Sequence, residues 1–136
     1  MDTVNSQEVR SPLVLAVDDD QQVLELGKLI LERGGFRVVA ATTGGEAIKA
    51  AEEMQLDLIL LDVGLPDMDG TLVCQRIRAF SQTPIIEVSG QRTTASDIAA
   101  VLDKGAVDYL IKPFSHLVLV AKVKAALRRA GSSVAA

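Results

Sequence analysis

The stretch DLILLDVGLPDMDG, Asp57 to Gly70, carries the strongest structural signal in the chain. The apolar run Leu56–Leu61, which overlaps the start of this stretch, is continuous rather than alternating, as is typical of a strand covered on both faces in a parallel sheet. The run ends on Asp62, and Gly64 and Pro66 then predict a turn. A carboxylate is costly to desolvate. Its position at the end of a buried strand therefore requires compensating groups nearby.

The rest of the chain repeats this strand-then-helix pattern. Short apolar runs predict five strands, at Leu13–Val17, Phe36–Ala41, Leu56–Leu61, Pro84–Ser89 and Tyr109–Ile111. Apolar residues at three- and four-residue spacing predict five helices, at Gln21–Arg33, Glu46–Met54, Thr71–Phe80, Thr94–Lys104 and Ser115–Ala130. Right-handed crossovers between such units give an α/β, doubly wound parallel sheet. We expect one domain over residues 12–130, with flexible tails at 1–11 and 131–136.

Composition limits the function classes. The 136-residue chain has a formal net charge of −4 and an isoelectric point near 4.9, which argue against nucleic-acid binding by this domain. No apolar segment approaches the ~20 residues that span a bilayer, and the polar start does not resemble a signal peptide. The single cysteine, Cys74, cannot form an internal disulfide. These features predict a cytoplasmic domain with no membrane partner.

Ionisable residues follow several of the predicted strands. Strand one ends in Asp18-Asp19-Asp20, strand three in Asp62, strand four in Ser89, and strand five in Lys112. Ligands of open α/β sheets bind beyond this edge. Gathered carboxylates repel each other unless a cation intervenes, and oxygen ligands suit Mg²⁺. With Lys112 as a fixed cation and Ser89 as a hydroxyl donor, the edge predicts a site where Asp62 accepts a phosphoryl group as nucleophile.

Two residues depart from the expected pattern. Gly27 lies inside the first predicted helix, where glycine costs about 1 kcal/mol relative to alanine, and we expect it to pack closely against the sheet. Glu87 lies in the fourth predicted strand among apolar residues. Since both faces of this sheet should be covered, Glu87 is expected to pair with a base or to have a raised pKa, unless the strand is displaced enough for it to reach water.

Four motifs match a known family: VLAVDDDQQVLEL, DLILLDVGLPDMDG, TPIIEVSG and GAVDYLIKPF. From about Leu13 to Arg129 the chain resembles the receiver domain of two-component response regulators. The resemblance implies a flavodoxin-like sheet in strand order 2-1-3-4-5 with five helices. It also implies a phosphoacceptor signalling domain that accepts a phosphoryl group from a sensor histidine kinase. Such a domain catalyses that transfer and the later acyl-phosphate hydrolysis itself, and is not otherwise an enzyme.

The resemblance implies specific roles at the metal and phosphorylation site. Asp62 matches the phosphoacceptor. Asp18 and Asp19 match the acidic pair that binds Mg²⁺ together with Asp62, and the backbone carbonyl of Gly64 matches a further ligand. Lys112 resembles the lysine that pairs with the phosphoryl group, and the bond from it to the following proline resembles one that is cis in the family.

The resemblance also implies a switch and a partner-binding face. Ser89 resembles the hydroxyl residue that follows the phosphoryl group, and Tyr109 the aromatic residue that changes rotamer with it. The face is formed by the fourth helix, fifth strand and fifth helix, where related regulators often carry charges. This chain instead places apolar residues around the tyrosine, so the expected partner-face residues are Ile98, Val107, Tyr109, Leu117 and Val118. We expect an apolar contact with a downstream effector domain or protein, or with a second copy.

Two alternatives remain open on the residues alone. A receiver-like module that is never phosphorylated, and acts only as an interaction module, would have the same fold. A haloacid-dehalogenase-type phosphatase would use Asp18 and Asp20 as its Asp-x-Asp pair, although Gln22 stands where that family expects threonine or valine.

Overall fold

The computed structural model describes residues 11–90 and 94–131 of the chain. Residues 1–10 and 132–136, which make up most of the predicted tails, lie outside the described residues. The strands are β1 (Leu13–Val17), β2 (Arg37–Ala41), β3 (Leu58–Asp62), β4 (Ile85–Ser89) and β5 (Asp108–Ile111). The helices are α2 (Gln21–Arg33), α3 (Gly44–Glu53), α4 (Gly70–Arg78), α5 (Ala95–Asp103) and α6 (His116–Arg129).

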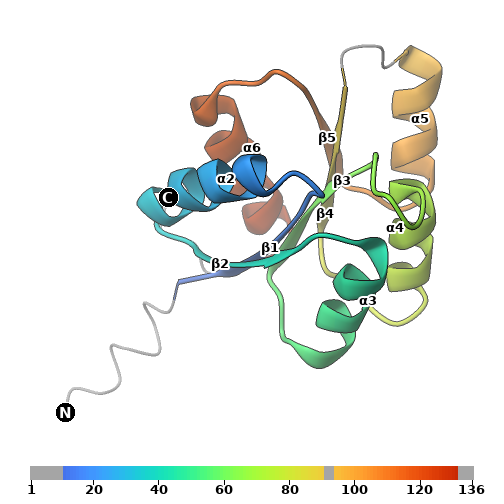
Figure 1. The fold of residues 1–136 in the computed structure, drawn as a ribbon, viewed down its shortest axis with the longest axis horizontal. Helices are drawn as coiled ribbons and strands as arrows, with labels where there is room; N and C mark the ends of the chain where they lie inside the picture. Colours follow the sequence, from blue (N-terminus) through green and yellow to red (C-terminus); the bar gives the residue numbers. More distant parts are fainter. Residues whose placement is uncertain (1–10, 91–93, 132–136) are drawn as a thin grey trace.

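The strands form one parallel sheet in the order β2-β1-β3-β4-β5, as the resemblance implies. Figure 1 shows α2 and α6 on one face of this sheet and α3, α4 and α5 on the other. The register aligns Val17 with Leu61, and Ser89 with Ile111. The carboxyl ends of β1, β3, β4 and β5 therefore meet at one edge of the sheet, next to the residues that follow each strand.

The continuous apolar strands supply both halves of the core, because successive side chains point to opposite faces. On β3, Leu58 and Leu60 join the cluster that packs under α2 and α6, whereas Ile59 and Leu61 join the cluster under α3, α4 and α5. Burying one such side chain stabilises the fold by roughly 1.5–3 kcal/mol. The predicted α/β doubly wound class, with a sheet covered on both faces, is confirmed.

The start of α3 differs from the prediction. The helix was expected to begin at Glu46 but begins at Gly44. The amides of Gly44 and Gly45 donate to the carboxylate of Asp67, at N–O distances of 2.7 and 2.9 Å. These two bonds hold the pKa of Asp67 below its usual range. A carboxylate from a distant loop thus satisfies the first amides of α3 and complements the positive end of its dipole.

The expectation for Gly27 was wrong. A Cβ built at Gly27 would meet no atom within 4 Å, so the sheet does not require glycine there. Gly27 instead lines an apolar groove of about 340 Å³, together with Leu24 and Ile30 of α2 and Phe114 and Leu119 near the start of α6. No contact among the described residues explains why glycine stands at this position.

In the part of the chain that the structure describes, no helix combines the length and the apolar character needed to cross a bilayer.

Candidate functional site

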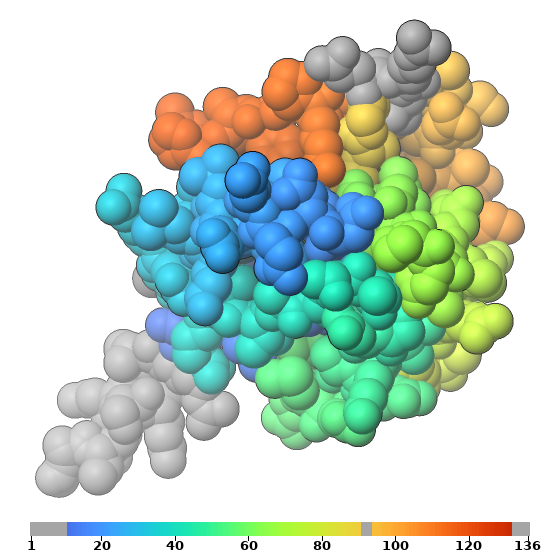
Figure 2. All heavy atoms as spheres, in the orientation of Figure 1, coloured from blue at the N-terminus to red at the C-terminus, as the bar shows by residue number. Residues whose placement is uncertain are grey.

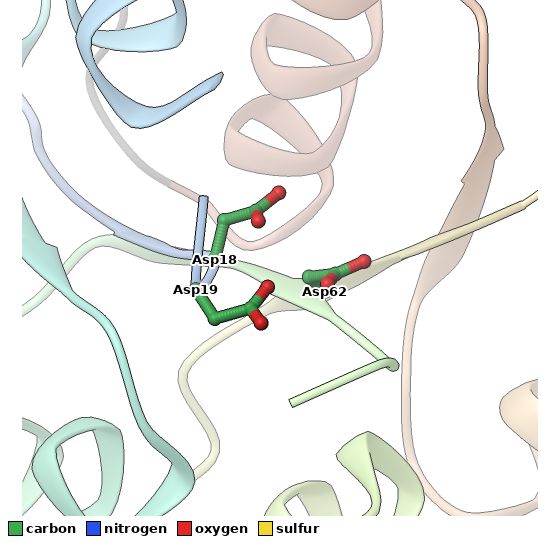
Figure 3. Close-up of side chains that lie close together, drawn as sticks. All are labelled: Asp18, Asp19 and Asp62. Atoms are coloured by element: carbon green, nitrogen blue, oxygen red, sulfur yellow. The ribbon is translucent and has the colours of Figure 1, made fainter. Parts of the chain in front are cut away.

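Three carboxylates meet at the carboxyl edge of the sheet. Asp18 and Asp19 directly follow β1, Asp62 is the last residue of β3, and Figure 3 shows their side chains next to one another. One carboxylate oxygen from each lies within 4.8 Å of the other two, a spacing that fits a shared metal ion. Asp18 and Asp62 are buried, and Asp19 is exposed. Among the described residues this is the acidic cluster best suited to the all-oxygen ligation that Mg²⁺ prefers.

The third aspartate of the run does not join the cluster. The carboxylate of Asp20 caps α2 by accepting hydrogen bonds from the amides of Gln22 and Val23, at 2.9 and 3.3 Å. The amide of Asp20 in turn donates to Asp18 at 3.0 Å, which helps to orient the Asp18 carboxylate. The first two aspartates of the run thus belong to the acidic cluster, whereas the third caps the helix. It also removes Asp20 from the Asp-x-Asp pair that a phosphatase would need.

Lys112 brings positive charge to the same place. Its Nζ lies 3.1 Å from Asp18 Oδ2 and 3.4 Å from Asp62 Oδ1. The backbone of Lys112 is tied to β4 by a 2.7 Å hydrogen bond from its amide to the Ser89 carbonyl, and the Lys112-Pro113 bond is cis, as the resemblance implies. Burial lowers the pKa of Lys112, but the hydrogen bond to Asp18 and the charges of Asp62 and Asp18 outweigh it, so the pKa lies above its ordinary value.

The balance of charge at Asp62 favours binding of a cation. Burial raises the pKa of Asp62, the negative charge of Asp18 raises it further, and Lys112 opposes both. Three carboxylates facing one ammonium leave excess negative charge in a partly buried site, which a divalent ion offsets. Gly64 is placed beside this charge, since a Cβ built on it would lie 3.7 Å from Asp62 Oδ2. The donor set therefore fits a hard divalent ion.

In the space-filling view, the segments that follow β1, β3 and β5, coloured blue, green and orange, gather on one face (Figure 2). Ser89 ends β4 at the same edge and is half-buried. It also lines a second cavity of about 340 Å³ between α4 and α5, together with Val63, Thr71 and Val101. The predicted hydroxyl residue thus lies between the acidic cluster and an open space on the α4 and α5 face of the sheet.

Tyr109 lies on β5, and its ring is half-buried against the core cluster under α3, α4 and α5. Lys122 of α6 lies over this ring, with its Nζ 4.7 Å from the ring centroid. The same ammonium donates to the Tyr109 carbonyl at 2.8 Å and to Asp108 at 3.1 Å. Sequence reasoning missed Lys122, because no pattern in α6 indicates which lysine reaches β5.

The predicted partner face is largely apolar and partly exposed. Relative exposure is 41% for Val107, 72% for Leu117 and 44% for Val118, while Ile98 is half-buried. Leu102 of α5, which the sequence did not single out, is 43% exposed as well. The ion pair between Lys122 and Asp108 lies beside these residues, but both of its partners belong to this chain.

Comparisons with known proteins agree with this geometry. Residues 14–124 match the family model described as the response regulator receiver domain. The transcriptional regulatory protein PrrA of Mycobacterium bovis is 44% identical over 125 residues, which cover 92% of this chain and 54% of that protein. KdpE of Mycobacterium tuberculosis, also a transcriptional regulatory protein, is 42% identical over 86% of this chain and 51% of its own length.

Solved structures agree with the sequence relatives. The crystal structure of a two-component response regulator from Clostridium difficile superposes with a TM-score of 0.84 at 35% identity, covering 90% of this chain and 100% of that one. A CheY-like receiver domain protein from Methanospirillum hungatei gives a TM-score of 0.81 at 32% identity, covering 88% of this chain and 95% of its own.

Proposed function

The chain belongs to the response regulator receiver family of two-component systems, and we propose that it acts in this role by carrying a phosphoryl group on Asp62. One observation carries the proposal: the carboxylates of Asp18, Asp19 and Asp62 meet within 4.8 Å of one another, and Lys112 lies 3.4 Å from Asp62. Clustered, partly buried carboxylates repel one another, so a module that only bound partner proteins would gain nothing from this arrangement. The phosphatase alternative is wrong, because the chain belongs to a signalling family.

The transfer is a nucleophilic displacement. A carboxylate oxygen of Asp62 attacks the phosphorus of a phosphohistidine; the O–P bond forms while the N–P bond breaks, and the imidazole nitrogen keeps the electron pair. Asp18, Asp19 and Asp62, with the carbonyl of Gly64, would hold Mg²⁺. When bound, the ion offsets negative charge on the attacking and phosphoryl oxygens. Later attack by water on the acyl phosphate releases phosphate and regenerates the carboxylate.

Two further side chains respond to the new charge. Lys112, which pairs with Asp62 and Asp18 in the resting site, pairs with the phosphoryl group once Asp62 carries it. The hydroxyl of Ser89 donates to another phosphoryl oxygen. Movement of Ser89 changes the space available to Tyr109 on the same side of the sheet. The phosphoryl group thereby shifts the equilibrium between two forms of the α5, β5 and α6 face.

The partners follow from the family. A sensor histidine kinase supplies the phosphoryl group, and an effector domain or protein reads the switched face. The chain spans about half the length of the curated relatives it matches, 54% of PrrA and 51% of KdpE, and both are named as transcriptional regulatory proteins. We therefore propose that residues 12–130 form the receiver unit, and that this unit makes no direct contact with nucleic acid.

Phosphorylation by a small donor tests the proposal. The purified chain is incubated with acetyl phosphate and Mg²⁺, and its intact mass is recorded. We expect the mass of one added phosphoryl group, which EDTA prevents and hydroxylamine removes, because acyl phosphates react with that nucleophile. An unmodified chain, or a label that resists hydroxylamine, would contradict phosphorylation of a carboxylate.

Lys112→Ala should weaken binding of the phosphoryl group. The ammonium compensates a charge of about −2 on the phosphoryl group, and losing a hydrogen bond to a charged group weakens binding by about tenfold or more. We therefore expect a folded variant whose beryllofluoride midpoint, measured by NMR with Mg²⁺ present, rises by at least that factor. Lys49→Ala, which removes an exposed lysine of α3, should leave the midpoint unchanged. An unaltered midpoint in Lys112→Ala would count against this role.

Val107→Asp combined with Val118→Asp should abolish association through the α5, β5 and α6 face. Charges at two exposed apolar positions must be desolvated in any apolar contact, so we expect beryllofluoride-dependent self-association, or binding of an added effector domain, to fall by about a hundredfold. Sedimentation velocity measures both. Met54→Asp is the control, because Met54 is 38% exposed at the end of α3, and α3 packs on β1, β2 and α4. Association that is instead lost on raising salt would indicate ion pairs.

A further inference from the structure

Glu87 is a buried carboxyl without a partner. It lies in the middle of β4, its relative exposure is 1%, and neither carboxyl oxygen has a hydrogen-bond partner among the described residues. Buried polar groups almost always have one, and leaving a buried group unsatisfied is costly. Glu87 shares its face of β4 with Ile85 and Ser89, since side chains alternate along a strand. The mechanism proposed above makes no use of it.

A donor without an acceptor lies on the neighbouring strand. The register of the sheet pairs Glu87 with Tyr109, and paired residues of parallel strands point to the same face. Adjacent strands lie about 4.8 Å apart, so the two side chains start from neighbouring positions. The contacts of Tyr109 involve its backbone and the face of its ring; among the described residues its hydroxyl makes no hydrogen bond.

The same face offers space for the ring. The cavity of about 340 Å³ between α4 and α5 is lined by Ser89 of β4 and by Ala100 and Val101 of α5. Val101 and the ring of Tyr109 belong to the same core cluster. A ring that leaves its position under Lys122 and turns inward therefore stays on the face that carries Glu87.

We propose that Glu87 is the internal hydrogen-bond acceptor for the hydroxyl of Tyr109, and that this bond forms only when the ring turns inward. The inference rests on the proposed function, because phosphorylation at Asp62 is what drives the turn. In the resting form Glu87 is unsatisfied, whereas in the switched form it is bonded. The pair thus gives the switched form an advantage that an apolar residue at position 87 would not provide, which shifts the equilibrium toward it.

A double-mutant cycle tests the pair. The parent chain, Glu87→Met, Tyr109→Phe and the double variant are titrated with beryllofluoride in the presence of Mg²⁺, and the midpoint is followed by NMR. Each single change should raise the midpoint by about fivefold to tenfold, the effect of losing one ordinary hydrogen bond. The double variant should be no weaker than the weaker single variant, because both changes remove the same bond. Glu87→Gln keeps an acceptor oxygen and should lie closer to the parent than Glu87→Met does.

Tyrosine emission gives a second readout. Tyr109 is the only tyrosine and the chain has no tryptophan, so the emission reports this ring alone. Beryllofluoride should protect the ring from acrylamide quenching in the parent, and protect it less in Glu87→Met. If the midpoint of the double variant instead rose by the product of the two single-variant factors, the hydrogen bond between Glu87 and Tyr109 would be contradicted. Equal protection of the ring in the parent and in Glu87→Met would contradict it too. Either result would leave the proposed function intact. If the parent itself fails to bind beryllofluoride with Mg²⁺, the proposed function fails, and the pair fails with it.

Discussion

Asp62→Asn is expected to lose Mg²⁺-dependent phosphorylation almost completely. An asparagine amide has nearly the same shape but is not a nucleophile, so labelling by acetyl phosphate should fall by at least about a hundredfold, as is usual when a nucleophile is removed. Intact mass after a fixed incubation measures the effect. The fold should survive, because burial and the charge of Asp18 both raise the pKa of Asp62, and a neutral side chain removes that unfavourable ionisation.

A matched control is available directly next to the cluster. Asp20→Asn removes a neighbouring carboxylate that caps α2 instead of facing Asp62, and asparagine is an equally good N-cap. This variant should be labelled like the parent. Equal labelling of Asp62→Asn and the parent, or transfer of the label to Asp18 or Asp19, would contradict the assignment.

Glu87→Met is expected to give the largest change in stability. Burial, and secondarily the charge of Asp69, raise the pKa of Glu87 from 4.5 to about 7. As pH rises, the unfolded chain therefore releases this proton before the folded chain does, and the parent loses stability between pH 4.5 and about 7. The gap between the two pKa values corresponds to about 3 kcal/mol, all of it lost by the time the pH exceeds the folded value.

Methionine at position 87 cannot ionise and suits a buried strand. At pH 8 the variant should exceed the parent in free energy of unfolding by up to about 3 kcal/mol, whereas below pH 4.5 the difference due to ionisation disappears. Urea unfolding at several pH values measures this, and comparing the two proteins cancels the titration of other groups. Glu25→Met, at an exposed position of α2, should leave the pH profile unchanged. Parallel profiles for Glu87→Met and the parent would show that Glu87 reaches solvent or a partner in solution.

Much of the fold and of the site could be predicted from local patterns. Continuous runs such as Leu13–Val17 and Leu56–Leu61 predicted buried parallel strands, because a sheet covered on both faces has no polar side. Once the strands are parallel, their carboxyl ends share one edge. The meeting of Asp18, Asp62 and Lys112 therefore follows from the order of residues along the chain, with distances that the structure supplies.

Other features depend on which side chains meet across the fold, and no local pattern encodes that. The carboxylate of Asp67, in a loop more than twenty residues away in sequence, accepts hydrogen bonds from the amides of Gly44 and Gly45, and α3 begins two residues earlier than predicted. Gly27 faces an open groove instead of the sheet. The sequence showed that Glu87 would need either a basic partner or a raised pKa, but only the packing of the fold shows that no base reaches it among the described residues. A pattern of apolar and polar residues determines which face an element buries, whereas the partner of each buried polar atom depends on the positions of all neighbouring elements at once.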